Sequence, residues 1–433
     1  MNRIILIGNG FDLAHGLATG YRHFIGDLWG KIVAEFNTSQ EESFENAFLS
    51  VPHANRISPK EFTDYKSFKK GLQKNNVLPH FKNYFLEAIL ERSLRDWVDI
   101  EEEYFRQIKK IVFGVVPVGV HQSKEDYQKN RIKKLNNCFE EIKQLMEQYL
   151  HKEEDKSSRT GRDDMANLFF DFLRVDDFPN NHKKEKTNLY WKYVSEILSN
   201  CVNDVNSGYR PLYEELVDRI AYRIQIKDKD KITTEHIIKK LQEDSDFSSY
   251  RNRFFPRTTL VLNFNYTIKT ESPYLKSQHC NRSIHIHGEL CDPDNPIIFG
   301  YGDELADEYK EIEKLNDNDY LKNVKSIKYL QTANYREMLK FIDSDYYQIY
   351  IFGHSCGISD RTLLHTLFEH ENCVSIKPFY YQKEENGIKS DDYENIIMNI
   401  SRNFKDKAAL REKVVNKTYC TPLPQNPRTV KGG

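Results

Sequence analysis

Four short apolar runs of the chain each end in residues that could bind or activate a small molecule. The first run, Ile4–Ile7, stops at Gly8-Asn9-Gly10. Glycine lets the backbone approach a phosphate closely, and a helix that starts there offers unpaired N–H groups and the positive end of its dipole. As the dinucleotide fingerprint GxGxxG the turn is incomplete, because Leu13 stands in the third glycine position. A phosphate site and an ordinary tight turn are both open for this segment.

The second run, Thr258–Asn263, ends in asparagines, which are unusual inside an apolar strand. Ligands bind beyond the carboxyl ends of parallel strands, so Asn263 and Asn265 are candidates for ligand contact. The alternative is that both side chains cap the next helix.

The third run ends in Ile284-His285-Ile286-His287-Gly288. Strand alternation places His285 and His287 on one face. A histidine at a strand end, directly before a glycine, is a candidate general base, and a satisfied core histidine is the alternative.

The fourth run ends in Gly353-His354-Ser355. The Ser355 hydroxyl or nearby backbone N–H groups could hold phosphate. The alternative is a capped turn that begins the next helix at Ser359 or Asp360.

Two metal sites are rival interpretations. The first would use the histidines and cysteines near the third run, but their spacing fits no standard zinc module, so we expect no metal there. Its members are His279, Cys280, His285, His287 and Cys291. The second site would hold the metal ion of a nuclease, with Asp99, Glu101, Asp303 and Glu304 as its ligands. Against it, Asp99 and Glu101 could simply be solvated beside a core Trp97.

Short β-branched or aromatic runs predict about six strands, and these alternate with helical patterns in the second half of the chain. Such alternation predicts an α/β fold with a parallel sheet flanked by helices. The predicted strands are Ile4–Ile7, Thr258–Asn263, Ser283–His287, Ile297–Phe299, Gln348–Phe352 and Cys373–Tyr381. The α/β core would comprise residues 1–36 plus 257–402, with a mainly helical insertion at 37–256 and an extension with a loose tail at 403–433.

Composition narrows the class of protein. The net charge of −2 gives no global argument for nucleic-acid binding. The seven cysteines are scattered without a CxxC pair, which favours free thiols in a reducing compartment. The longest mainly apolar run, Ile111–Val120, is too short for a membrane helix, which needs about 20 residues. We therefore predict a cytoplasmic protein.

The order of these motifs resembles the sirtuin-like, NAD-binding variant of the Rossmann-like fold. The matching positions are Gly8, Gly10, Gly16-Leu17, Asn265, His287-Gly288, Gly353 and Ser355. Asp12 stands where that fold carries a serine, and Thr267 where relatives carry an aspartate. The zinc module of sirtuin deacylases is missing, which argues against deacylation. More specifically, IGNGFDLAHGL, Trp97-x-Asp99-x-Glu101, LNFNYT, IHIHGEL, IIFGYGDE and IFGHSCGISD resemble the bacteriophage abortive infection AbiH family.

The resemblance implies an antiphage effector that hydrolyses NAD to nicotinamide and ADP-ribose. Implied catalytic residues are Asn265, His287 and Asp12, with Asp12 facing the ribose or the reacting centre. Implied NAD-binding residues are Gly8, Asn9, Gly10, Phe11, Gly16, Asn263, Gly288, Gly353, His354 and Ser355. No metal is expected. A homo-oligomer and a phage-derived trigger or partner defence protein are expected. The alternatives are an inactive nucleotide-binding sensor or scaffold, and the nuclease toxin above.

Overall fold

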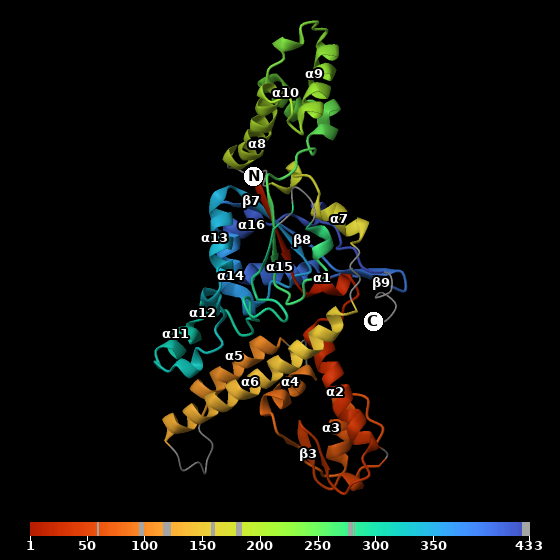
Figure 1. Cartoon of the computed structure of the whole chain (residues 1–433), viewed down its shortest axis with the longest axis vertical. Coiled ribbons are helices and arrows are strands. Elements are labelled where there is room, and N and C mark those ends of the chain that lie inside the picture. The colour runs from red at the N-terminus through yellow and green to blue at the C-terminus, as the bar shows by residue number, and fades with distance from the viewer. Residues whose placement is uncertain are drawn as a thin grey trace.

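The structure is a computed structural model that gives the chain an α/β architecture. It describes residues 1–58, 60–94, 99–115, 123–156, 161–178, 184–275, 280 and 282–426, with the backbone alone at 184–188. A parallel sheet lies at the centre, and helices cover it and extend from two of its sides (Figure 1).

Five parallel strands form the sheet, in the order β6-β5-β1-β7-β8. They are β1 (Asn2–Ile7), β5 (Thr259–Asn263), β6 (Arg282–His285), β7 (Tyr347–Phe352) and β8 (Cys373–Phe379). The chain adds β5 and β6 on one side of β1, then returns to add β7 and β8 on the other. The strands are apolar runs because helices bury both faces of the sheet. The strand order thus reverses at β1, which is where open parallel sheets bind ligands.

The fourth predicted strand, Ile297–Phe299, is not a strand in the structure. The Ile298 N–H of this segment donates to the carbonyl of His287 at 2.8 Å. Phe299 stacks on Phe139 with ring centroids 4.7 Å apart, so its apolar side chain serves a helical core rather than the sheet. The third predicted strand is also shorter than expected, so His287 lies in the loop after β6.

Two apolar cores cover the faces of the sheet. One face packs against α13 (Asn334–Ser344), α14 (Arg361–Glu369), α15 (Tyr393–Arg402) and α16 (Lys407–Lys413). The other packs against α1 (Asn9–Ala14) and α7 (Asp163–Phe169). An exposed hairpin of β9 (Gln382–Glu385) and β10 (Ile388–Asp391) follows β8.

The segment predicted as one helical insertion divides into two regions on opposite sides of the sheet (Figure 1). The lower helical region comprises α2 (Tyr21–Thr38), α3 (Tyr65–Lys74), α4 (Tyr84–Ser93), α5 (Ile100–Phe113), α6 (Lys124–Glu154) and a small sheet of β2 (Phe44–Glu45), β3 (Leu49–Val51) and β4 (His80–Phe81). The upper helical region comprises α8 (Lys184–Asn203), α9 (Arg210–Ile224) and α10 (Thr234–Glu243). Their apolar cores are separate.

Two short helices follow β6, α11 (Asp307–Glu313) and α12 (Lys325–Lys328). Within the ranges given above, no helix combines the length and the apolarity needed to cross a membrane.

Candidate functional site

A cavity of about 770 Å³ lies at the carboxyl edge of the sheet. Each of the five strand ends contributes a residue to its wall: Gly8 after β1, Asn265 after β5, His287 after β6, His354 after β7 and Phe379 at the end of β8. Helices α5 and α6 of the lower helical region also line it. The cavity is therefore a joint between the sheet and this region.

Most of the residues predicted for the site meet in this cavity. Those that line it are Gly8, Asn9, Gly10, Asp12, Gly16, Asn265, His287, Gly353, His354 and Ser355. Phe11, Asn263 and Gly288 are not among its lining residues. Phe11 is fully buried against Phe352, and the Asn263 side chain accepts the N–H of Asn265 at 2.8 Å. Asn263 thus shapes the turn that presents Asn265.

The glycine turn packs against the turn that follows β7. A Cβ on Gly10 would lie 2.8 Å from the Cα of Gly353, which itself has φ +69°. The N–H groups of Gly8 and Gly10 donate to the carbonyls of Phe352 and Gly353 at 3.1 and 2.8 Å. The glycines here permit close packing of two turns, and the amides expected to bind phosphate already have partners.

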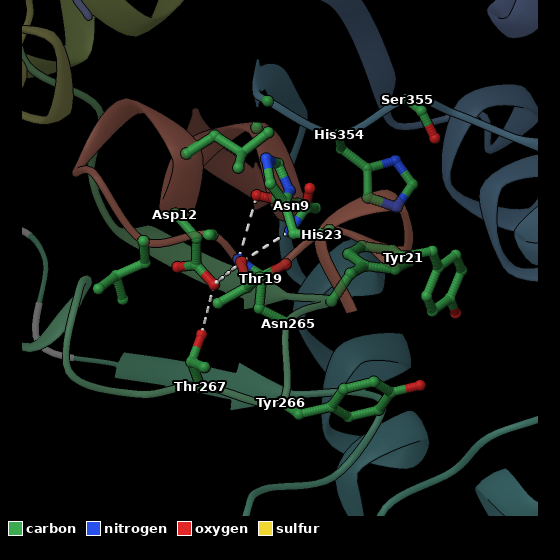
Figure 2. Close-up of a pocket in the computed structure, with 18 of the residues that line it drawn as sticks. Asn9, Asp12, Thr19, Tyr21, His23, Asn265, Tyr266, Thr267, His354 and Ser355 are labelled. Carbon is green, nitrogen blue, oxygen red and sulfur yellow. Dashed lines mark hydrogen bonds between the residues drawn. The ribbon is translucent and has the colours of Figure 1, made fainter. Parts of the chain in front are cut away.

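Asp12 is fully buried, and threonine hydroxyls surround it (Figure 2). Thr19 and Thr267 donate to one carboxylate oxygen at 3.0 and 2.6 Å, and Thr270 donates to the other at 2.7 Å. Burial raises the pKa of Asp12 to about 6, although the three hydroxyls oppose this. Asp12 ties α1 to the loop after β5, so its oxygens are engaged by the protein rather than aimed at a reacting centre as predicted.

Asn265 links the ends of β1 and β5. Its side-chain amide donates to the carbonyl of Gly8 at 3.1 Å (Figure 2). Since the nitrogen is used in this way, the side-chain oxygen is the atom that could accept a hydrogen bond from a ligand.

His287 is buried and has three polar neighbours. Its Nδ1 lies 3.2 Å from the carbonyl oxygen of Phe264, so Nδ1 carries a proton, because a carbonyl can only accept. Its Nε2 lies 3.2 Å from the Tyr329 hydroxyl and 3.1 Å from the Asp360 carboxylate. Burial and the nearby Lys325 ammonium lower the pKa of His287 to about 4, although Asp360 opposes them. His287 is thus neutral at pH 7 and can accept a proton.

The turn after β7 places His354 and Ser355 at different depths. His354 is buried, and its Nε2 lies 3.5 Å from Asp360. Ser355 is exposed at the rim of the cavity (Figure 2). Cys356 is buried with a positive φ of 54°, and burial raises the pKa of its thiol, so it is a poor nucleophile.

Sequence reasoning missed a buried ion-pair group beside His287. Lys325, at the start of α12, has no exposed surface. Its Nζ lies 2.8 Å from Glu101 of α5 and 2.7 Å from Asp360. Glu101 is only 4% exposed, so the expectation that it is solvated is wrong. Trp97, the residue expected beside it, lies outside the described residues.

The pKa values of the two acids bonded to Lys325 shift in opposite directions. Burial acts to raise the pKa of Asp360, but the Lys325 ammonium outweighs burial and holds this pKa well below its usual range. Burial raises the pKa of Glu101 to about 8, despite the pull of Lys325. Asp360 is thus the acid whose negative charge balances the Lys325 ammonium most directly.

The family model described as bacteriophage abortive infection AbiH matches residues 58–382. The chain belongs to the AbiH family. Membership indicates a role in abortive infection, a defence against bacteriophage. No curated protein and no solved structure matches the chain. The AbiH match includes Asp99, Glu101, Asn265, His287 and Ser355 but begins after the glycine turn.

The cavity of this AbiH chain has acidic walls. Five carboxylic acids line it, and no lysine or arginine does so among the residues that the structure describes. The acids are Asp12, Asp99, Glu101, Asp360 and Asp392. Such a cavity favours a ligand, or a part of a ligand, that carries positive charge.

The acids proposed for a nuclease do not form one metal cluster. Asp303 pairs with Arg361 at 3.3 Å, and Glu304 accepts a hydrogen bond from Ser326. Across the described ranges, no group of three or more His, Cys, Asp or Glu side chains is arranged to hold a metal ion. Of the residues considered for a zinc site, His279 lies outside those ranges, and His285 bonds to Glu271 at 2.5 Å.

Proposed function

We propose that this AbiH chain is an abortive-infection effector that binds NAD in the cavity and hydrolyses its nicotinamide–ribose bond. The observation that carries this proposal is the convergence of Gly8, Asn265, His287 and His354 on one cavity where the strand order reverses. Counted along the chain, the order of the five strands is 3-2-1-4-5, as in doubly wound dinucleotide-binding sheets. The cavity also falls within the range of roughly 300–1,000 Å³ that is usual for small-molecule sites.

A pair of exchanged residues supports the likeness to the sirtuin-like fold. Asp12 stands at the serine position of that fold, and Thr267 at the aspartate position of relatives. In this chain the Thr267 hydroxyl donates to the Asp12 carboxylate at 2.6 Å. The hydroxyl and the carboxylate have therefore changed places across one hydrogen bond, so the two departures from the pattern compensate each other.

The charges of the cavity suit the proposed reaction. NAD and water give ADP-ribose, nicotinamide and a proton. The bond breaks so that nicotinamide leaves with the electron pair as a neutral molecule, and positive charge develops on the ribose. Asp99 and Asp392, the lining acids that are bonded neither to Lys325 nor to the threonine hydroxyls, stabilise that charge. His287, neutral at pH 7, takes a proton from the attacking water at Nε2, where the water replaces the hydrogen bond from the Tyr329 hydroxyl. The Asn265 side-chain oxygen orients this water or a ribose hydroxyl.

Phosphate contacts would come from side chains rather than from the glycine turn. The Gly8 and Gly10 amides are already bonded within the protein. The candidates at the cavity wall are Asn9, His23 and Ser355, and Asn9 and Ser355 are neutral donors.

The test is to incubate the purified chain with NAD, alone and with lysate of phage-infected cells, and to measure nicotinamide. We expect release that falls roughly 10²–10⁴-fold in His287→Ala, the usual effect of removing a general base. His285→Gln is the matched control, because His285 is a buried neighbour that bonds to Glu271 and does not line the cavity. The proposal fails if no nicotinamide appears under any condition and His287→Ala still protects cells from phage.

The occupied amides of the glycine turn favour one second candidate, a sensor or scaffold that binds a nucleotide without turnover. Stoichiometric binding of NAD in calorimetry, with no product after long incubation, would distinguish this function from hydrolysis. Measurable turnover that depends on His287 would exclude it.

A further inference from the structure

Three side chains connect the lower helical region to His287. Glu101 of α5 accepts from Lys325, and Lys325 lies 2.7 Å from the same Asp360 oxygen that is 3.1 Å from His287 Nε2. All four side chains are at least nine-tenths buried. Because little water reaches these side chains to screen their charges, the protonation state of each one strongly affects the pKa of its neighbour.

His287 could adopt two forms in this environment. As an imidazolium it would donate from Nε2 to Asp360, and as a neutral ring it would accept there from the Tyr329 hydroxyl. The side chains that bear on the choice come from every neighbouring element. They are Asp360 and His354 after β7, Lys325 and Tyr329 at α12, Tyr266 after β5, and Glu101 of α5.

Lys325 is the cation that decides between these forms. It has no exposed surface and contacts the Asp360 oxygen more closely than His287 does. With Lys325 in place, the Asp360 charge is already balanced, so a second proton on His287 would create an unbalanced buried cation. Without Lys325, the Asp360 carboxylate would face His287 alone and would hold a proton on the ring.

We propose that Lys325 is a positioning residue that keeps the His287 imidazole in its neutral, proton-accepting form, and that Glu101 of the lower helical region anchors Lys325. The value of this arrangement for catalysis rests on the proposed function, but the state of His287 does not. Glu101 is itself fixed, since its other oxygen accepts the N–H of Gly300 at 2.9 Å. The helical region is thus connected to the proposed base through a single buried lysine.

Histidine NMR titration of the full-length chain tests this proposal. The His287 signal is assigned by its loss in His287→Gln. In the unaltered protein we expect His287 to remain neutral down to about pH 5. In Lys325→Met, a side chain of similar length without charge, we expect the pKa of His287 to rise by about 1–3 pH units. Lys325→Arg should restore the unaltered behaviour.

Lys328→Met is the matched control. Lys328 lies on the same short helix, and its Nζ donates to Asn323 at 3.1 Å. We expect no change in the His287 titration. An equal rise in Lys328→Met, or no rise in Lys325→Met, would overturn the proposal.

If Lys325→Met does not fold, the His287 titration of the unaltered protein still tests the proposal. Titration of His287 at about pH 6.5 or above would mean that Lys325 does not hold the ring neutral, and the proposal would be wrong. The NMR titration and the nicotinamide assay together also distinguish a failure of this proposal from a failure of the proposed function. A neutral His287 in a chain that releases no nicotinamide leaves this inference intact and removes the proposed function. When nicotinamide is released, the acid limb of the pH–rate profile should move upward in Lys325→Met.

Discussion

At the scale of single residues, Asp12 shows how a carboxylate can be structural inside a site. A carboxylate near a phosphate would be repulsive, which is why sequence reasoning aimed it at the ribose. The three threonines could not be foreseen, because Thr267 and Thr270 are more than 250 residues away in the chain. The threonine hydroxyls donate to the buried Asp12 carboxylate, which therefore links α1 to the loop after β5.

Asp12→Asn should change how stability depends on pH. Burial raises the pKa of Asp12 from 3.8 to about 6, so between these values the folded chain binds a proton that the unfolded chain releases. The Asp12 contribution to stability is therefore fully present below about pH 4 and is lost as the pH rises through 6. The loss is about 3 kcal/mol at 1.36 kcal/mol per pH unit.

The measurement for Asp12→Asn is the melting temperature of both proteins at pH 4.5 and 7.5. Asparagine keeps an oxygen for Thr19 and Thr267 and can donate to Thr270, but it does not ionise. We expect the variant to gain stability relative to the unaltered protein as the pH rises between these values. A constant difference at both pH values would show that Asp12 does not titrate in this range.

At the scale of elements, the sequence predicted what local pattern decides. The strands β1, β5 and β7 were predicted because buried parallel strands are continuous apolar runs. The charged stretch 124–154, with Tyr127, Ile132 and further apolar residues on one side, predicts a helix, and α6 has these bounds. Ser123 caps it by accepting the Asp126 N–H. The sequence pattern also predicts one continuous helix over Asn316–Ile342. This prediction is wrong, because the chain turns between α12 and α13 and buries Lys325 against Glu101. That ion pair spans 224 residues and has no local signature.

Asp99 both caps α5 and lines the cavity, so its removal should affect both stability and the proposed NAD binding. One oxygen of Asp99 caps α5 by accepting the N–H groups of Glu101 and Glu102 at 2.9 and 3.0 Å. The other accepts from Ser359 at 3.1 Å. Asp99→Ala should therefore cost about 1 kcal/mol of stability, as cap removal usually does, and should also weaken NAD binding or turnover.

Ser123→Ala is the control for Asp99→Ala. Ser123 caps α6 in the same way but is exposed and does not line the cavity. We expect a similar loss in melting temperature with unchanged NAD binding. If both variants lose binding equally, Asp99 acts only through the stability of the lower helical region.

At the scale of the whole molecule, one long helix connects the cavity to the far end of the lower helical region (Figure 1). At its carboxyl end, α6 contacts two segments that line the cavity, the turn at Ala18 and the loop after β5. The Tyr149 hydroxyl donates to the carbonyl of Ala18 at 2.6 Å, and the next residue, Thr19, donates to Asp12. Glu154 accepts the N–H groups of Ile268 and Lys269 at 2.6 and 3.2 Å. A trigger that binds the lower helical region could therefore act on the site through α6.

Glu154→Ala tests this connection. The substitution leaves two backbone N–H groups of the loop after β5 without their acceptor, at a cost of about 1–3 kcal/mol. The loop also carries Thr267 and Thr270, so its loosening should release Asp12 and move Asn265. We expect faster hydrogen exchange in residues 265–271 and weaker NAD binding, measured by mass spectrometry and calorimetry. Glu147→Ala is the control, since Glu147 is on the same helix but pairs only with surface Lys143 in the described contacts. Unchanged exchange at 265–271 would mean that α6 supports the cavity without controlling it, and a trigger would then have to reach the site through α5 and Lys325.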